Sequence, residues 1–348
     1  MNRHIINIAL KLVLLGLMLV ILNIIYGASL WFYDVDTHSD TLENLWPHQY
    51  DSDVIYFGES SNFYVEHPDT PKVRISDYLN RRIEELRINH VDNAGLQASN
   101  YLHIMRHIPK DAPLKGVVVT VNLRSFGPTW LYDANTNYLN KADELIKPRP
   151  KLLNRFFVAL KAYDHFDDAE RKELLKNARK APIEFDGQLP FRSLYEWNEW
   201  MANGGIRTEE GKWDKPKISL ACHHIKNFAF VIDFEKHPVI KSFDDIVELA
   251  QLRGWQLAFH ILSENITEAE ELVGPDLATL MEYNVTRLVE YYEAKGVLVV
   301  NNLRTVPEPE YRDRIFPTEH YNNYGKKLCA KKLEQAIRKR WTQMLEHE

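Results

Sequence analysis

Cysteine is scarce in this sequence: among 348 residues the only cysteines are Cys222 and Cys329. Two cysteines cannot form the network of disulfides that holds small secreted domains together. A single bridge between them and two separate buried thiols are both compatible with the sequence. The fold is therefore expected to depend on a hydrophobic core, which a chain of this length can bury as one large domain or two smaller ones.

The sequence also lacks a strong charge of one sign. Its formal net charge is −6 at pH 7, and no run of like charges resembles the basic surface that follows a nucleic-acid backbone. These features exclude nucleic acid as an expected partner. Internal repeats and low-complexity tracts are also missing, and the 45% hydrophobic content is typical of a folded protein.

The long apolar run of the chain is at its N-terminus. The apolar residues of 5–26 are interrupted only by Asn7, Lys11 and Asn23, and this length suits a helix that crosses about 30 Å of hydrocarbon. Basic residues come before most of this run and acidic residues follow it. The positive-inside rule therefore predicts a single-pass membrane protein with a cytoplasmic N-terminus and a periplasmic or extracellular domain. A cleaved signal peptide is the alternative, but Tyr26-Gly27-Ala28 is a poor cleavage site.

The pattern of elements divides the chain into three parts. Residues 1–28 form the cytoplasmic N-terminus and transmembrane anchor, 29–50 a stalk with several aromatic residues, and 51–348 the globular domain. Strands alternate with helices at both ends of that domain, which predicts an α/β fold: a three-layer α/β/α sandwich with a central parallel sheet. A helical, aromatic-rich insertion at about 125–240 interrupts the alternation. Insertions of this length often act as lids or binding elements.

Small and polar residues follow three of the predicted strands. The first strand ends in Gly58-Glu59-Ser60, the second in Asn93-Ala94-Gly95 and the third in Asn122. Since parallel strands end at the same edge of a sheet, where open α/β folds bind ligands, these residues are expected to meet. A further polar residue, His320, comes just before the C-terminal helix.

Acyl transfer requires the residue types that these strand ends supply. A hydroxyl attacks, an imidazole takes its proton, and hydrogen-bond donors hold the oxyanion. We predict Ser60 as nucleophile, His320 as base, and an oxyanion hole formed by the backbone N–H groups of Ser60 and Gly95 with the Asn122 amide. Each residue also has an ordinary structural interpretation, such as Ser60 as a helix cap. The occurrence of all these residues in this order along the chain favours the catalytic interpretation.

These motifs together resemble the SGNH (GDSL-like) hydrolase superfamily. Gly58-Glu59-Ser60 stands where the family has Gly-Asp-Ser, Gly95 and Asn122 match its glycine and asparagine blocks, and His320 with the following Tyr-Asn-x-x-Gly matches its histidine block. The resemblance implies an SGNH-type sandwich and a serine-dependent O-acyltransferase or esterase.

The acid that orients the histidine departs from the family pattern. The family usually has an aspartate three residues before the histidine, where this chain has Pro317. Glu319, adjacent to His320, is the favoured acid, and Asp313 is the alternative if the loop folds back. A serine–histidine dyad without an acid is the third interpretation.

The membrane anchor narrows the resemblance to bacterial envelope-glycan acylation proteins of the teichoic-acid D-alanylation and alginate acetylation types. That resemblance implies transfer or hydrolysis of an acetyl or similar acyl group on a cell-envelope polysaccharide, with the bilayer and a multi-pass membrane O-acyltransferase as partners. The competing function is a catalytically inactive module that binds glycan or scaffolds such an acyltransferase.

Two further groups of residues bear on the expected ligands. Trp197 and Trp200 in the insertion are candidates for stacking on sugar rings, with core packing of the insertion as the alternative. The adjacent ligand-type residues Cys222-His223-His224 cannot all reach one tetrahedral ion, so we expect no metal. We also expect no cofactor.

Overall fold

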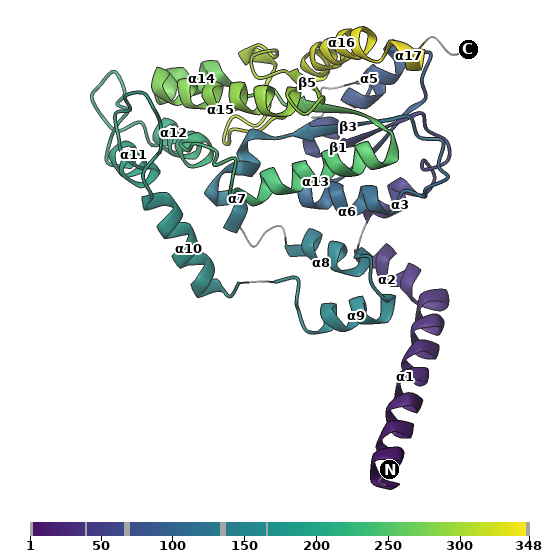
Figure 1. The fold of residues 1–348 in the computed structure, drawn as a ribbon. Helices are drawn as coiled ribbons and strands as arrows, with labels where there is room; N and C mark the ends of the chain where they lie inside the picture. Colours follow the sequence, from purple (N-terminus) through teal and green to yellow (C-terminus); the bar gives the residue numbers. More distant parts are fainter. Residues whose placement is uncertain (1–2, 39, 66–69, 133–136, 165, 346–348) are drawn as a thin grey trace. The chain divides into compact units, whose positions relative to one another are not determined.

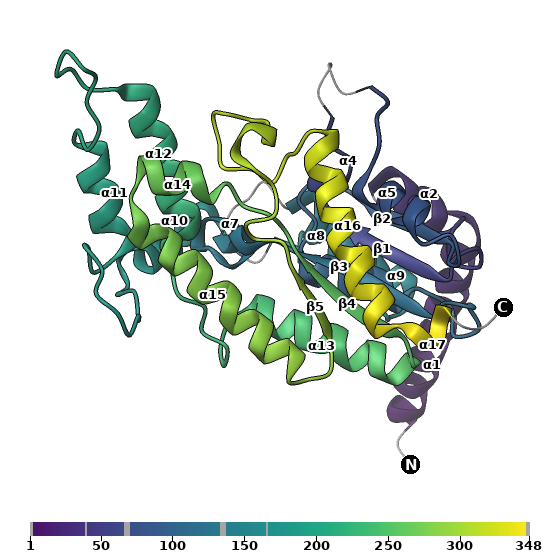
Figure 2. The ribbon, with the colours of Figure 1, turned by 90° about the horizontal axis from the view of Figure 1, so that it is seen from above.

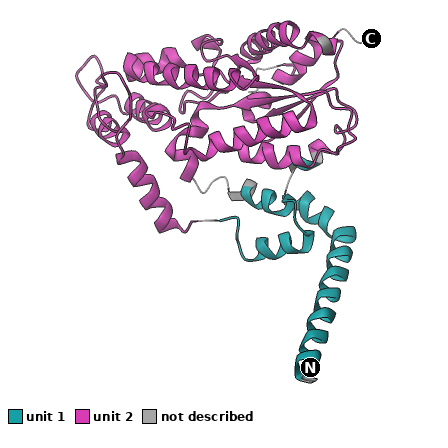
Figure 3. Ribbon diagram, viewed as in Figure 1, with its two compact units in different colours: residues 1–43, 135–165 teal, residues 44–134, 166–348 magenta. Residues whose placement is uncertain are grey.

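The computed structural model describes residues 3–38, 40–65, 70–132, 137–164 and 166–345. The chain forms two compact units (Figure 3): unit 1 comprises residues 1–43 and 135–165, and unit 2 comprises residues 44–134 and 166–348. Part of the insertion therefore packs with the N-terminal helices rather than with the globular domain. The sequence pattern predicts the whole insertion as part of the globular domain.

Unit 2 is built on a parallel sheet of five strands in the order β2-β1-β3-β4-β5 (Figure 1). Every residue of β1 and β3 is buried, which explains why these two strands are continuous apolar runs rather than alternating patterns. The sequence predicts all five strands, and the α/β class is confirmed. The strands are β1 Val54–Gly58, β2 Ile88–Asp92, β3 Gly116–Val121, β4 Gln256–Ile261 and β5 Leu298–Asn301.

Helices cover both faces of this sheet (Figures 1 and 2). On one face, α5 (Ile75–Arg82) and α16 (Asn323–Arg340) contribute to a buried cluster with Tyr56 of β1. The opposite face carries α6 (Ala98–Arg106) and α13 (Pro238–Arg253), where Phe243 of α13 lies 5.1 Å from Phe259 of β4 between ring centroids. The remaining helical segments of unit 2 are α4 Ser60–Phe63, η1 Leu123–Phe126, α7 Pro128–Tyr132, α10 Asp168–Lys180, α11 Leu194–Ala202, α12 Lys215–Phe228, α14 Ile266–Leu272, α15 Pro275–Glu293, η3 Glu308–Glu310 and α17 Thr342–Leu345.

The strand order reverses beside β1. The chain goes from β1 outward to β2 and then returns to β3 on the other side of β1. The connections that leave β1 and β3 therefore run to opposite faces of the sheet, and such a switch point is where open α/β sheets bind ligands. Ser60 follows β1 and Asn122 follows β3, so both residues lie at this point.

Unit 1 contains α1 (Arg3–Ser29), α2 (Trp31–His38), α8 (Asn137–Ile146) and α9 (Lys151–Ala159). The stretch His4–Ser29 of α1 has a mean hydropathy of 2.7 and its apolar window is fully exposed, so by length and composition it suits a membrane anchor or a signal sequence.

The segment expected to be a stalk is helical, because α2 and α3 (Asp40–Leu45) occupy most of it. Trp31 of α2 is buried, and its indole N–H donates to the Leu145 carbonyl of α8 at 3.3 Å. This aromatic residue packs within unit 1 instead of marking a free linker.

Cys222 and Cys329 are both buried and unpaired. Of the two interpretations that the sequence allows, the structure supports separate buried thiols.

Candidate active site

A tight turn at the end of β1 presents Ser60. A Cβ atom added at Gly58 would lie 2.9 Å from the Cβ of Asn62, so this close approach requires glycine. The buried Asn62 amide donates to Asp92 at 2.6 Å, and its oxygen accepts from the Ser76 backbone N–H at 2.9 Å. These bonds tie the turn to the end of β2 and to α5, and thereby fix the position of Ser60.

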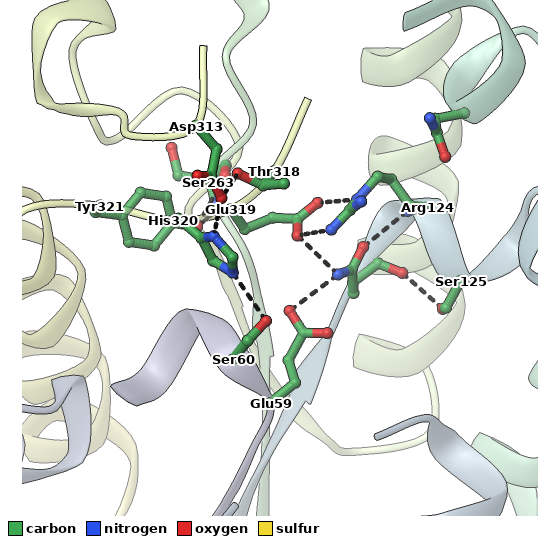
Figure 4. Close-up of polar contacts among 12 residues, drawn as sticks. Glu59, Ser60, Arg124, Ser125, Ser263, Asp313, Thr318, Glu319, His320 and Tyr321 are labelled. Carbon is green, nitrogen blue, oxygen red and sulfur yellow. Dashed lines mark hydrogen bonds and ion pairs between the residues drawn. The ribbon is translucent and has the colours of Figure 1, made fainter. Parts of the chain in front are cut away.

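His320 links Ser60 to an acid (Figure 4). Its Nε2 atom lies 2.9 Å from the Ser60 hydroxyl, and its Nδ1 atom is hydrogen-bonded to the Asp313 carboxylate. A carboxylate at Nδ1 holds the ring proton there, which leaves the Nε2 lone pair for the hydroxyl. The three side chains thus have the geometry of a serine–histidine–aspartate triad.

The orienting position belongs to Asp313 and not to Glu319, the acid favoured from the sequence. The loop before His320 folds back on itself, because Tyr311 and Tyr321 pair as an antiparallel bridge and the Arg312 N–H donates to the His320 carbonyl at 2.8 Å. Asp313 adopts a φ of 55°, a left-handed conformation that aspartate tolerates better than most residues. From the sequence, Asp313 is predicted only as the alternative acid.

Tyr64 is a site residue that the sequence analysis misses. Its ring stacks on His320 with centroids 3.9 Å apart and planes within 7°, and its hydroxyl donates to Asp313 at 3.2 Å. It therefore holds both the base and the acid of the triad. The available signal is its spacing of four residues from Ser60, which places two side chains on one side of a helical turn.

Asn122 does not point its amide at the serine. Its Nδ2 atom donates to Glu59 at 2.9 Å and to Glu319 at 3.0 Å, while its oxygen accepts from the Arg124 backbone N–H. A primary amide has two N–H donors, and these two buried carboxyl groups take both. The predicted contribution of Asn122 to the oxyanion hole is therefore not seen. Instead, Asn122 links two acidic side chains beneath the site.

Glu319 belongs to this same buried cluster. Its carboxylate forms an ion pair with the Arg124 guanidinium through two nitrogen atoms (Figure 4), and the Glu319 side chain is only 1% exposed. Burial and, second, the charge of Glu319 raise the pKa of Glu59 to about 8. The same causes raise the pKa of Glu264 well above its usual range. The cluster thus holds one paired carboxylate beside two carboxyl groups that favour their protonated form.

The pKa of His320 is lowered from its ordinary value because burial penalises the imidazolium, although the hydrogen bond to Asp313 acts in the opposite direction. At neutral pH the imidazole is therefore mainly neutral and able to accept a proton. This is the form that a general base requires.

Gly95, the second expected backbone donor, lies in the loop after β2 with a φ of 71°. This left-handed conformation favours glycine. The oxyanion role of the Ser60 and Gly95 N–H groups stays a prediction.

The two tryptophans proposed for sugar stacking differ in exposure. Trp197 is 1% exposed and packs near Phe191, so it belongs to the core of the insertion and presents no face to a sugar. Trp200 is 52% exposed, with its ring centroid 5.4 Å from that of Phe191. Only Trp200 keeps a surface for stacking.

The residues Cys222, His223 and His224 have separate neighbours. His224 lies 3.2 Å from Glu268, while the His223 ring packs on Phe316 at 4.5 Å between centroids. Within the described ranges of the chain, no group of three or more His, Cys, Asp or Glu residues is arranged to hold a metal ion.

Neither a family model nor a characterised protein matches this chain by sequence. Solved structures that are similar over most of its length include a lipase and two esterases. A GDSL-like lipase from Bacteroides thetaiotaomicron has 11% identity and a TM-score of 0.34 over 82% of this chain and 87% of its own. The acetylxylan esterase Axe2 from Geobacillus stearothermophilus has 9% identity and a TM-score of 0.36 over 86% and 95%. A carbohydrate acetylesterase family member from Sinorhizobium meliloti has 11% identity and a TM-score of 0.33 over 84% and 99%. Because the sequence identities and TM-scores are this low, the activity of the chain has to be inferred from its own side chains.

Proposed function

We propose that this protein is a serine-dependent O-acyltransferase or esterase of the SGNH type. The observation that carries the proposal is the contact of His320 with the Ser60 hydroxyl at 2.9 Å on one ring nitrogen and with Asp313 on the other. These residues come from the end of β1 and from the loop before α16, at the switch point of the sheet. An inactive module has no need to keep this alignment.

The reaction follows from the geometry. His320 Nε2 takes the hydroxyl proton of Ser60 as Oγ attacks the ester carbonyl, and Asp313 stabilises the imidazolium that forms. The backbone N–H groups of Ser60 and Gly95 hold the oxyanion. His320 then gives its proton to the leaving alkoxide, and an acyl group remains on Ser60. A water molecule or an acceptor hydroxyl, activated by His320, attacks this acyl-serine and frees the enzyme.

We infer further that the acyl group is an acetyl or similar group on a cell-envelope polysaccharide, and that a multi-pass membrane O-acyltransferase is a partner of this protein. Helix α1 supports this inference because its length and composition suit a membrane anchor, which would keep the domain at a membrane surface. The exposed Trp200 supports a carbohydrate ligand, since aromatic faces suit sugar rings.

A fluorophosphonate probe and a chromogenic acetyl ester test the catalytic proposal on the full chain. Wild-type protein is expected to be labelled and to release the chromophore, and Ser60→Ala is expected to lose both while keeping its fold. Ser61→Ala, at the adjacent buried serine, is the matched control and should retain both signals. Folded wild-type protein that neither reacts with the probe nor hydrolyses the ester would favour the inactive module instead.

A further inference from the structure

Helix α9 of unit 1 turns an apolar stripe outward. Leu153, Phe156 and Leu160 are 40%, 55% and 61% exposed, and their spacing of three and four residues places them on one side of the helix. The inward side is mixed: Asn154 and Val158 are both buried, and the Asn154 amide donates to the carbonyls of Leu145 and Lys147. Three large apolar side chains are thus left on the outward side, where a surface helix in water carries polar ones.

The start of α9 contacts the C-terminal part of α1, and the two helices lie side by side in Figure 1. The Leu152 backbone N–H donates to the Asn23 side-chain oxygen at 2.9 Å. The Lys151 side chain packs against Gly27. A Cβ atom added at Gly27 would lie 3.2 Å from the Cδ atom of Lys151. Asn23 and Gly27 both fall in the last two turns of α1. Helix α9 therefore begins beside the end of the apolar span.

Residues typical of a membrane interface surround this contact. The Lys151 ammonium lies 3.7 Å from the centre of the Trp31 ring, and Arg155 forms an ion pair with Asp34 at 2.9 Å. Basic and aromatic side chains of this kind favour the headgroup level. Beside them, Ile24 of α1 is 63% exposed, so apolar surface is present on both helices at the same level.

We propose that α9 is a second membrane contact of unit 1, an in-plane helix whose Leu153, Phe156 and Leu160 side chains enter the boundary between headgroups and acyl chains. The occupant of the apolar stripe is the lipid bilayer, because the stripe continues the surface of a helix that itself suits a membrane. The inference rests on the anchor in the proposed function. A single anchoring helix can rotate about its axis, whereas two contacts hold unit 1 in one orientation.

Depth-dependent quenching in proteoliposomes tests this proposal on the full chain. Phe156→Cys and Leu160→Cys are each labelled with an environment-sensitive fluorophore, and quenching by lipids with a nitroxide near the headgroup is measured. The matched control is Leu252→Cys, at an apolar residue of α13 in unit 2 that is 84% exposed. The native chain serves as labelling control, since both natural cysteines are buried. We expect severalfold stronger quenching at positions 156 and 160 than at 252.

Two further measurements separate the possible failures. Alkaline extraction of the same samples reports whether the protein is anchored, and ester hydrolysis reports whether the active site is intact. Quenching at 156 and 160 no stronger than at 252, in protein that resists extraction, would overturn the α9 contact while leaving the anchor in place. Release of the protein by alkali would remove the anchor and the α9 contact together, and hydrolysis would still decide the catalytic proposal.

Discussion

Three side chains act on different properties of His320. Ser60 lies at one ring nitrogen, where the proton is to be accepted, and Asp313 lies at the other, where it fixes the tautomer. Tyr64 covers the face of the ring and fixes its plane. Together they leave the imidazole little freedom to rotate, which reduces the entropy lost when the transition state forms.

Neutral substitutions of Asp313 and Glu319 test which of these two acids belongs to the triad. Asp313→Asn should lower kcat by about 10⁴-fold, because an amide at this position favours the wrong imidazole tautomer. Glu319→Gln should change kcat far less, since its carboxylate contacts Arg124 and Asn122 instead. Initial rates with an acetyl ester measure both variants. A larger loss in Glu319→Gln, with the fold intact, would contradict the assignment of the acid.

The pH dependence of the rate should reflect the burial of His320. The reactive form is the neutral imidazole, so the rate falls when the ring gains a proton. Since burial lowers the pKa of His320 from its ordinary value of 6.5, the acidic limb of the rate should be centred below pH 6.5. Measurement of kcat/KM from about pH 4 to 8 covers the expected limb. An acidic limb centred above pH 6.5 would contradict this result.

The sequence predicts the site only in part, and the reason is the distance between partners along the chain. Ser60 and His320 follow or precede elements with clear patterns, so their meeting follows from the parallel sheet. Asp313 reaches His320 through a fold-back that no local pattern indicates. Asn122 is bound by Glu59 and Glu319, which come from separate segments, so its loss as an oxyanion donor is not visible in the sequence.

At the scale of elements, the loop that carries Asp313 and His320 is fastened to the end of β4. The Tyr321 hydroxyl donates to the Ser263 carbonyl at 2.8 Å, and the Tyr311 hydroxyl lies 2.8 Å from the Ser263 hydroxyl. Glu319 adds a second attachment through Arg124 of η1. The loop is therefore held at both ends and on one side.

The Arg124–Glu319 pair should contribute strongly to the stability of this loop. Arg124→Met should reduce the free energy of unfolding by about 3–5 kcal/mol, because it leaves a buried carboxylate without its cation. The double variant Arg124→Met/Glu319→Gln should recover part of this loss, since no charge is then buried unpaired. Urea unfolding of the three proteins measures the effect. Equal stability of Arg124→Met and wild type would show that the pair adds nothing.

Strands and helices of unit 2 follow from apolar runs and their length, and the sequence predicts them well. The division of the insertion does not follow, because it depends on contacts between α8 or α9 and the N-terminal helices. The Leu152–Asn23 hydrogen bond joins residues far apart in the chain and has no sequence signature.

Across the whole molecule, the contribution of Glu59 to stability should fall as the pH rises toward about 8. Glu59 keeps its proton in the folded chain up to this pH, since its pKa is raised to about 8, whereas in the unfolded chain a glutamate ionises near its ordinary value of 4.5. The stabilisation by Glu59 is complete at pH values below its pKa in the unfolded chain. It is lost as the pH rises through its pKa in the folded chain. The slope is at most about 1.4 kcal/mol per pH unit.

Glu59→Gln should flatten this dependence, because the amide does not titrate. Thermal or urea unfolding of wild type and variant between about pH 5 and 8 measures the two slopes. The exposed Glu84→Gln is the matched control and should keep the wild-type slope. A slope unchanged in Glu59→Gln would mean that this carboxyl group is ionised in the folded protein.

The pairing of β3 with β4 has a consequence for biosynthesis. The two strands are hydrogen-bonded neighbours from Gly116 with Gln256 to Val121 with Ile261, although the whole insertion separates them in the chain. During translation β3 is complete long before its neighbour exists, and its apolar edge stays open. An open edge of this kind invites pairing with other chains, so the nascent protein is expected to need a chaperone until β4 has been made.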